Sequence, residues 1–162
     1  MEKRTAFIGH RNLWGKSSEV EEKLYKEVEK QIQNGCKFFT MGTHGEFDKI
    51  ALNVCRILKR TCPDIEIEVV ITSLHTITPI IDHDPIWGDE TYKPYSDVKT
   101  AMYDIEEQHF KRRITVSNQQ MLNLCDTLIC YVDTTRTYGG AILAYKYAKK
   151  KGLQIVNLYK NC

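Results

Sequence analysis

The feature that most constrains the fold of this chain is a regular alternation of short apolar runs with amphipathic helical patterns. The apolar runs lie at residues 5–8, 37–41, 65–72, 127–132 and 154–158, and each has the length and composition of a β-strand. Between the first two runs, Val20, Leu24, Val28 and Ile32 recur at helical spacing. Strands that alternate with helices favour a parallel sheet with right-handed crossovers. The sequence therefore predicts an α/β fold whose parallel sheet has about five strands flanked by helices.

Local signals predict where the helices begin and end. Ser18 and Glu21 match a capping box, and Gly35 and Gly152 are placed to end helices in a left-handed conformation. A second helix is expected from 47 to about 62, and helical character, broken near 114–116, from about 96 to 125. Residues 73–99 contain prolines and no sustained period, which predicts a long irregular connection. With no linker or low-complexity tract, residues 1–162 are expected to form a single domain.

Composition argues against several classes of function. The 23 basic and 21 acidic residues nearly balance, which gives no electrostatic footprint for nucleic acid. No signal peptide or membrane span is apparent, so we expect a cytoplasmic protein that makes no membrane contact. The six cysteines form no Cys-x-x-Cys pair and suit reduced thiols in that compartment. Asp82-His83-Asp84 looks metal-like, but adjacent side chains rarely point at one ion, so neither a metal nor another cofactor is predicted.

Three glycine-containing loops follow predicted strands and lead into helical patterns. Because the carboxyl ends of parallel strands meet at one edge of a sheet, the loops are expected to come together there. Glycine lets a ligand approach the backbone, and the N–H groups at the start of a helix attract an anion. The sequence therefore predicts a pocket for a nucleotide-like small molecule. The loops contain Gly9-His10-Arg11, then Gly42-Thr43-His44-Gly45-Glu46 with Asp48, and finally Asp133-Thr134 with Tyr138-Gly139-Gly140.

Two carboxylates in the second loop have separate interpretations. Asp48 lies at the start of a helix, where it could cap exposed N–H groups. Glu46 has no such role, so it is a candidate for holding a ribose hydroxyl or for acting as a general base. In the first loop, Arg11 could pair with a phosphate or a carboxylate, or be a solvated residue. No Gly-Lys-Ser/Thr follows the glycines, so the loop is not a Walker A sequence.

Taken in order, these segments resemble the SLOG superfamily, named after the SMF/DprA proteins and the LOG phosphoribohydrolases, and within it the YspA-like branch. The resemblance rests on residues 6–11, Gly42-x-x-Gly45-x-Phe47-Asp48, Met121 with residues 125–133, residues 139–152 and residues 155–158. It implies a Rossmann-like fold of the SLOG type. It also implies a nucleotide or nucleotide-derived ligand, for example an ADP-ribose-like molecule, at the carboxyl edge of the sheet.

The chain departs from the pattern of this superfamily in two places. The helix after Gly139-Gly140 lacks the catalytic glutamate that LOG enzymes and nucleoside deoxyribosyltransferases carry. Residues 117–121 read Ser-Asn-Gln-Gln-Met, where the relatives often have Arg-Asn-Arg-Trp-Met. Candidate ligand contacts outside the three glycine motifs are therefore Asn118, Arg113 and Arg136.

Three functions remain open from the sequence. The first is a binding module for a nucleotide-derived small molecule. The second is a LOG-like N-glycosidase, or nucleoside monophosphate phosphoribohydrolase, in which Glu46 or Asp48 replaces the missing glutamate as the catalytic carboxylate. The third is a protein-interaction module in which residues 73–99 dock a partner and the pocket is vestigial. A homo-oligomer is compatible with each of these functions.

Overall fold

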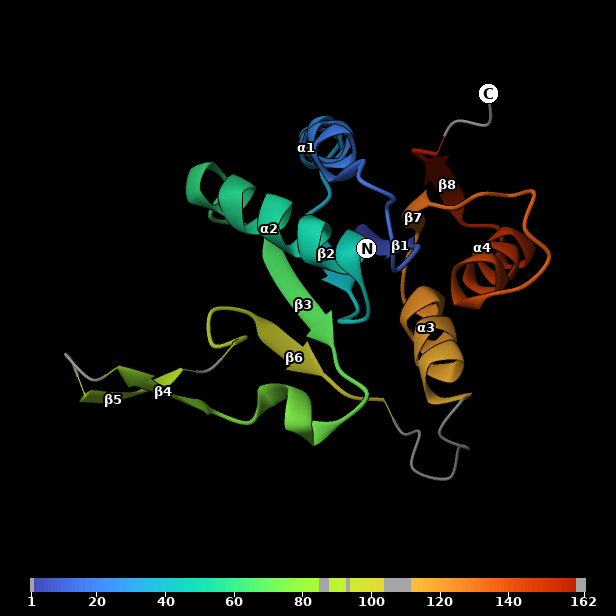
Figure 1. Ribbon diagram of the computed structural model, residues 1–162. Coiled ribbons are helices and arrows are strands. Elements are labelled where there is room, and N and C mark those ends of the chain that lie inside the picture. Colours follow the sequence, from blue (N-terminus) through green and yellow to red (C-terminus); the bar gives the residue numbers. More distant parts are fainter. Residues whose placement is uncertain (1, 85–87, 93, 104–111, 160–162) are drawn as a thin grey trace.

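In a computed structural model of the protein, which describes residues 2–84, 88–92, 94–103 and 112–159, the chain builds an α/β structure around a parallel sheet (Figure 1). The strands of this sheet are β1 (Arg4–Gly9), β2 (Phe38–Met41), β3 (Glu66–Val70), β6 (Lys99–Ala101), β7 (Thr127–Tyr131) and β8 (Gln154–Asn157). The helices are α1 (Ser17–Gln33), α2 (Glu46–Thr61), α3 (Arg113–Asn123) and α4 (Gly140–Lys151), with a short 3-10 helix at Leu74–Ile77.

The sheet has the strand order β6-β3-β2-β1-β7-β8, and each neighbouring pair is parallel. This confirms the predicted α/β fold with helices on both faces of a parallel sheet. The described part of this sheet has six strands, so the expectation of about five was one too low.

Side chains of β1 alternate between the two faces of the sheet, and this alternation defines two cores. Phe7 packs among buried residues of α1 and α2, such as Leu24 and Phe47. Ala6 and Ile8 pack among buried residues of α3 and α4. The helices α1 and α2 therefore cover one face and α3 and α4 the other, as Figure 1 shows. A strand covered on both faces must be apolar throughout, and β7 is buried at every position.

The helix ends follow the sequence signals only in part. The predicted capping box is wrong, because α1 begins at Ser17 with Lys16 as its N-cap and without a side-chain cap. The N–H of Val20 already donates to the Lys16 carbonyl, so Ser18 lies inside the first turn rather than before it. Gly35 and Gly152 have φ angles of 93° and 81°, which confirms the predicted left-handed ends.

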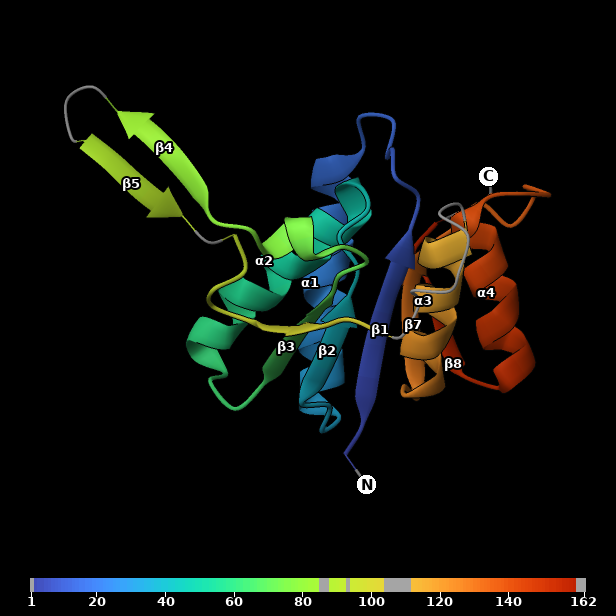
Figure 2. The same cartoon turned by 90° about the horizontal axis from the view of Figure 1, so that it is seen from below.

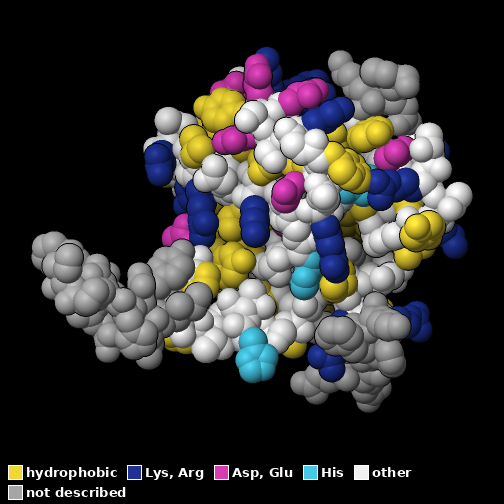
Figure 3. Space-filling model, viewed as in Figure 1, with side chains coloured by type: hydrophobic (Ala, Val, Ile, Leu, Met, Phe, Trp, Pro, Cys, Tyr) yellow, Lys and Arg dark blue, Asp and Glu magenta, His cyan; other side chains and the backbone are white. Residues whose placement is uncertain are grey.

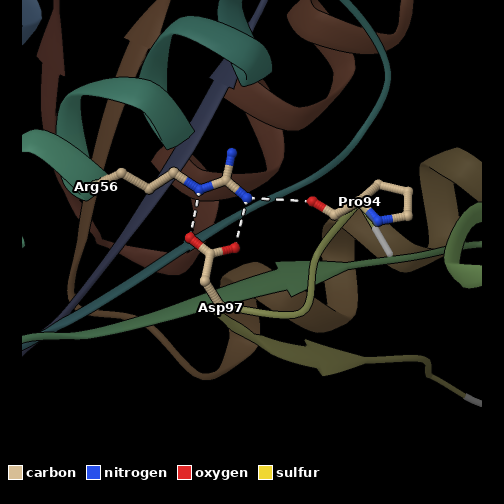
Figure 4. Close-up of polar contacts among 3 residues, drawn as sticks. All are labelled: Arg56, Pro94 and Asp97. Carbon is tan, nitrogen blue, oxygen red and sulfur yellow. Dashed lines mark hydrogen bonds and ion pairs between the residues drawn. The ribbon is translucent and has the colours of Figure 1, made fainter. Parts of the chain in front are cut away.

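The connection between β3 and β6 is more regular than the sequence predicted. After the 3-10 helix it forms an antiparallel hairpin of β4 (Ile80–Asp84) and β5 (Gly88–Tyr92), which extends away from the sheet (Figures 1 and 2). Arg56 of α2 fastens the returning chain, donating to both carboxylate oxygens of Asp97 at 2.8 and 2.7 Å and to the Pro94 carbonyl at 3.2 Å (Figure 4). A hairpin therefore takes the place that a helix has in most parallel crossovers.

The helical stretch predicted from 96 to 125 is also corrected. Residues 99–101 form β6, which pairs with β3, and α3 spans only Arg113–Asn123. The break expected near 114–116 is absent, since these residues lie within α3. Residues 104–111 fall outside the described part of the chain. A strand of three residues is too short to show a period, which explains why the sequence pattern did not reveal it.

The surface shows no strong separation of charge on the face drawn in Figure 3. Lys and Arg side chains are interspersed there with Asp and Glu, in keeping with the near balance of the composition. None of the helices in the described residues has the length and apolar character that crossing a membrane requires.

Candidate functional site

The strand order creates a switch point between β1 and β7. From β1 the sheet extends through β2, β3 and β6 to one edge, whereas β7 and β8 lie on the other side of β1. The loop after β1 leads to α1 on one face, and the loop after β7 leads to α4 on the opposite face. Loops that diverge in this way leave a crevice at the carboxyl edge, where open α/β sheets bind ligands.

A cavity of about 350 Å³ lies at this switch point. Its volume is near the lower end of the range for small-molecule sites. Residues from all three glycine-containing loops and from α3 contribute to its wall. The predicted site residues that line it are Gly9, His10, Arg11, His44, Asp48, Asn118, Arg136, Tyr138, Gly139 and Gly140. The structure thus brings together loops that are far apart in the sequence.

The other predicted residues do not line this cavity: they are Gly42, Thr43, Gly45, Glu46, Arg113, Asp133 and Thr134. Arg113 lies in the first turn of α3, where its Nε atom is buried and has no hydrogen-bond partner among the described residues. Asp133 closes a turn, because its Oδ1 accepts bonds from the hydroxyl and the N–H of Thr135 at 2.6 and 3.0 Å. These two bonds lower the pKa of Asp133.

The glycines of the three loops serve different needs. A Cβ atom at Gly9 would lie 2.3 Å from Cγ of Phe47, and one at Gly45, whose φ is 139°, would lie 2.5 Å from Cα of Arg11. Packing inside the protein therefore requires glycine at both positions. A Cβ atom at Gly140 would meet nothing within 4 Å, and its φ lies outside the left-handed region. The fold does not require glycine there, and the open backbone at the start of α4 is accessible to a ligand.

The structure gives Glu46 a role that the sequence did not reveal. Its Oε2 accepts a hydrogen bond from the N–H of Leu13 at 2.7 Å, and its own N–H donates to the Arg11 carbonyl at 2.9 Å. Glu46 therefore ties the loop after β1 to the start of α2. A carboxylate in the first turn also suits the dipole of that helix.

Asp48 is the carboxylate that lines the cavity. Its Oδ2 accepts a hydrogen bond from the N–H of His44 at 2.9 Å, so it stabilises the loop before α2. Burial raises the pKa of Asp48 to about 6, and the His44 hydrogen bond and the Arg11 charge act in the opposite direction. A carboxyl group with this pKa can exchange protons near neutral pH.

The two histidines of the cavity are kept neutral mainly by burial. Nε2 of His10 accepts the N–H of Asp133 at 2.8 Å, which requires that this nitrogen carries no proton. Burial, and after it the charge of Arg136, lowers the pKa of His10. Nε2 of His44 forms a hydrogen bond with the Thr72 hydroxyl at 3.0 Å, and burial is the main cause of its lowered pKa. The positive charge of the cavity at neutral pH therefore resides on its arginines.

The prediction missed Trp14, which lines the cavity with its side chain 48% exposed. The guanidinium of Arg136 lies over its ring, 4.6 Å from the centroid, and the ring of His10 meets it edge-on at 5.5 Å. Asn12 and Ile114 line the cavity as well. The available signal was a large aromatic residue among polar residues between a strand and a helix.

A solved structure provides an independent view of the fold. The crystal structure of TM1055, a target of the Northeast Structural Genomics Consortium, matches this chain with a TM-score of 0.55 and 12% sequence identity. The match covers 94% of this chain and 72% of that chain. The fold is Rossmann-like. At this identity the likeness shows the fold alone. No protein-family model matches the chain, and no curated protein is significantly similar to it.

The cavity of this Rossmann-like fold combines groups that suit an anionic ligand. Arg11 and Arg136 both line it and supply positive charge. The helix α4 begins at its wall without a side-chain cap, and the first N–H groups of a helix have no partner within the helix. Trp14 adds a planar aromatic surface. A ligand with an anionic group and a planar ring would therefore find a complementary group for each part.

Proposed function

We propose that the protein binds a nucleotide-derived ligand in this cavity, as expected of a SLOG-type protein. The observation that carries the proposal is the open backbone at Gly140, where α4 begins at the cavity wall. A phosphate placed there accepts hydrogen bonds from the N–H groups of the helix and is favoured by the helix dipole. Arg11 and Arg136, on the same wall, supply guanidinium groups that pair with phosphate oxygens.

The size of the cavity bears on the ligand. About 350 Å³ is modest for a small-molecule site, which favours one nucleotide unit, such as AMP, inside the cavity. A larger compound, such as ADP-ribose, would extend into solvent. Binding without turnover is supported by the position of Glu46, whose carboxylate is engaged by the N–H of Leu13 and lies off the cavity wall.

Native mass spectrometry of freshly purified protein tests the proposal. The protein should retain a small molecule that is released on denaturation and identified as a nucleotide derivative. Protein purified without a ligand should bind AMP or ADP-ribose in isothermal titration calorimetry. If neither compound bound at millimolar concentration, and no nucleotide derivative were retained, the proposal would be wrong.

One observation favours N-glycosidic hydrolysis as a second candidate. Asp48 lines the cavity, and its pKa of about 6 suits a group that stabilises a ribose oxocarbenium ion or moves a proton. In this case Asp48→Asn should abolish the release of the base from AMP, which NMR can monitor, while the variant still binds AMP. Glu46→Gln is the matched control and should retain both. A wild type that released no base from AMP would eliminate this candidate, and an Asp48→Asn protein that still released the base would refute the role of Asp48.

A further inference from the structure

Trp14 has a backbone conformation that the fold alone does not explain. Its φ is 52°, Gly15 after it has a φ of 79°, and the N–H of Lys16 donates to the Leu13 carbonyl at 3.1 Å. Two central residues with positive φ define a turn of the I′ type, in which Gly, Asn and Asp dominate. A bulky residue with positive φ is uncommon and costs stability, and such residues cluster at ligand sites.

Two hydrogen bonds fix the first half of the turn that carries Trp14. The N–H of Trp14 donates to Oδ1 of Asn12 at 2.7 Å, and the N–H of Leu13 donates to Oε2 of Glu46 at the same distance. The side chain of Leu13 is fully buried, whereas that of Trp14 is 48% exposed on the cavity wall. These contacts anchor the backbone and present the indole to the cavity instead of burying it in a core.

Arg136 indicates what the indole can hold. Its planar guanidinium lies over the ring, 4.6 Å from the centroid. Guanidinium groups stack on aromatic faces, as nucleobases do. A base that takes this position would release Arg136, which lies on an exposed stretch of the loop after β7, to pair with an anionic group of the same ligand.

From these contacts we infer that Trp14 determines the specificity of the site, its indole being the platform on which the base of the ligand stacks. The inference rests on the proposed function and deepens it, because it assigns the base to the loop after β1 and the phosphate to the start of α4. The ligand class is then a nucleotide with an intact base, and a sugar phosphate without a base would lack this contact.

Calorimetric titration of AMP and ADP-ribose into the wild type, Trp14→Leu and Trp14→Phe tests this inference. Both substituents are unbranched at Cβ, so they meet the same backbone restriction as tryptophan, and the melting temperatures should stay close to that of the wild type. Leucine removes the aromatic face, so its variant should bind about 10- to 100-fold more weakly. Phenylalanine keeps an aromatic face and should retain most of the affinity.

The outcomes separate this inference from the proposed function. If the wild type binds AMP and Trp14→Leu binds it equally well, the platform is refuted while the proposed function stands. Equal losses in Trp14→Leu and Trp14→Phe would also refute stacking. If neither compound binds the wild type, the proposed function fails and the inference fails with it. As a second readout, AMP should change the fluorescence of Trp14 in a Trp87→Phe background, and an unchanged signal from a protein that binds AMP would refute the contact.

Discussion

Gly140 and Gly9 provide a matched pair of substitutions, because both line the cavity and only one is required by packing. A Cβ atom added at Gly140 would meet nothing within 4 Å, and the φ of Gly140 lies outside the left-handed region, so alanine fits there without backbone strain. Alanine there should stabilise the fold by about 0.4–1 kcal/mol, through the entropy of the unfolded chain. For a protein of this size the melting temperature should rise by about 1–4 °C.

At Gly9 the same added carbon would lie 2.3, 2.5 and 2.7 Å from three atoms of Phe47, a fully buried residue of the core. To avoid these close contacts, α2 or β1 must shift, and overpacking of this kind lowers the free energy of unfolding by about 1–3 kcal/mol. The melting temperature of Gly9→Ala should therefore fall by about 2–12 °C. Differential scanning calorimetry of the wild type and both variants measures this contrast.

Binding completes the comparison between the two variants. In Gly140→Ala the added methyl occupies space where the proposed phosphate approaches α4, and loss of one charge-assisted hydrogen bond costs about 1.5–3 kcal/mol. AMP should then bind about 10- to 100-fold more weakly to a protein that is at least as stable as the wild type. A melting temperature of Gly140→Ala below that of the wild type would contradict the open space at this position, and an unchanged affinity for AMP would contradict a phosphate site there.

Three further predictions follow from the contacts around the site and from the Arg56 ion pair. Burial raises the pKa of Asp48 from 3.8 to about 6, so between these pH values the folded protein keeps a proton that the unfolded chain releases. The free energy of unfolding of the wild type should therefore fall by up to about 3 kcal/mol as the pH rises through this window. Thermal unfolding at pH 4 to 7 measures this loss, which should be absent in Asp48→Asn. Glu46→Ala leaves the N–H of Leu13 without its acceptor, so the free energy of unfolding measured in urea should fall by about 1–3 kcal/mol. Glu46→Gln keeps an oxygen acceptor and should be nearly as stable as the wild type. Equal losses in the two variants would contradict the role of this hydrogen bond. Arg56→Ala removes an ion pair in which the Asp97 side chain is 54% exposed, so the free energy of unfolding should fall by only about 0.5–1 kcal/mol. Amide hydrogen exchange in residues 94–101 should become faster. Unchanged exchange would show that the ion pair does not hold this segment against α2.

Much of the fold could be predicted because its determinants are local. The apolar runs of β1, β2, β3, β7 and β8 are visible as strands, and Gly35 and Gly152 end their helices as their conformational freedom predicts. β6 was missed because its place depends on pairing with β3 across the hairpin, and not on a pattern of its own. Such long-range pairing leaves no trace in three residues.

The candidate site shows the same division between local and long-range determinants. The sequence could predict that the loops after β1, β2 and β7 meet at one edge of the sheet, because the carboxyl ends of parallel strands lie at the same edge. The separate roles of Glu46 and Asp48 could not be predicted, because they depend on which backbone N–H each carboxylate meets. Trp14 is an aromatic residue among polar ones, but its exposure could not be predicted, because it results from a turn whose anchors include Glu46, which is distant in sequence.

We propose that a nucleotide binds at the switch point between β1 and β7. Binding at this place can be measured by titrating AMP into ¹⁵N-labelled protein and following the amide chemical shifts. We expect the changes in chemical shift to concentrate in residues 9–14, 44–48 and 136–142, which surround the cavity. Shifts confined to the second hollow of the described surface, which is lined by Lys3, Lys30 and Gln154, or no shifts at all, would contradict it.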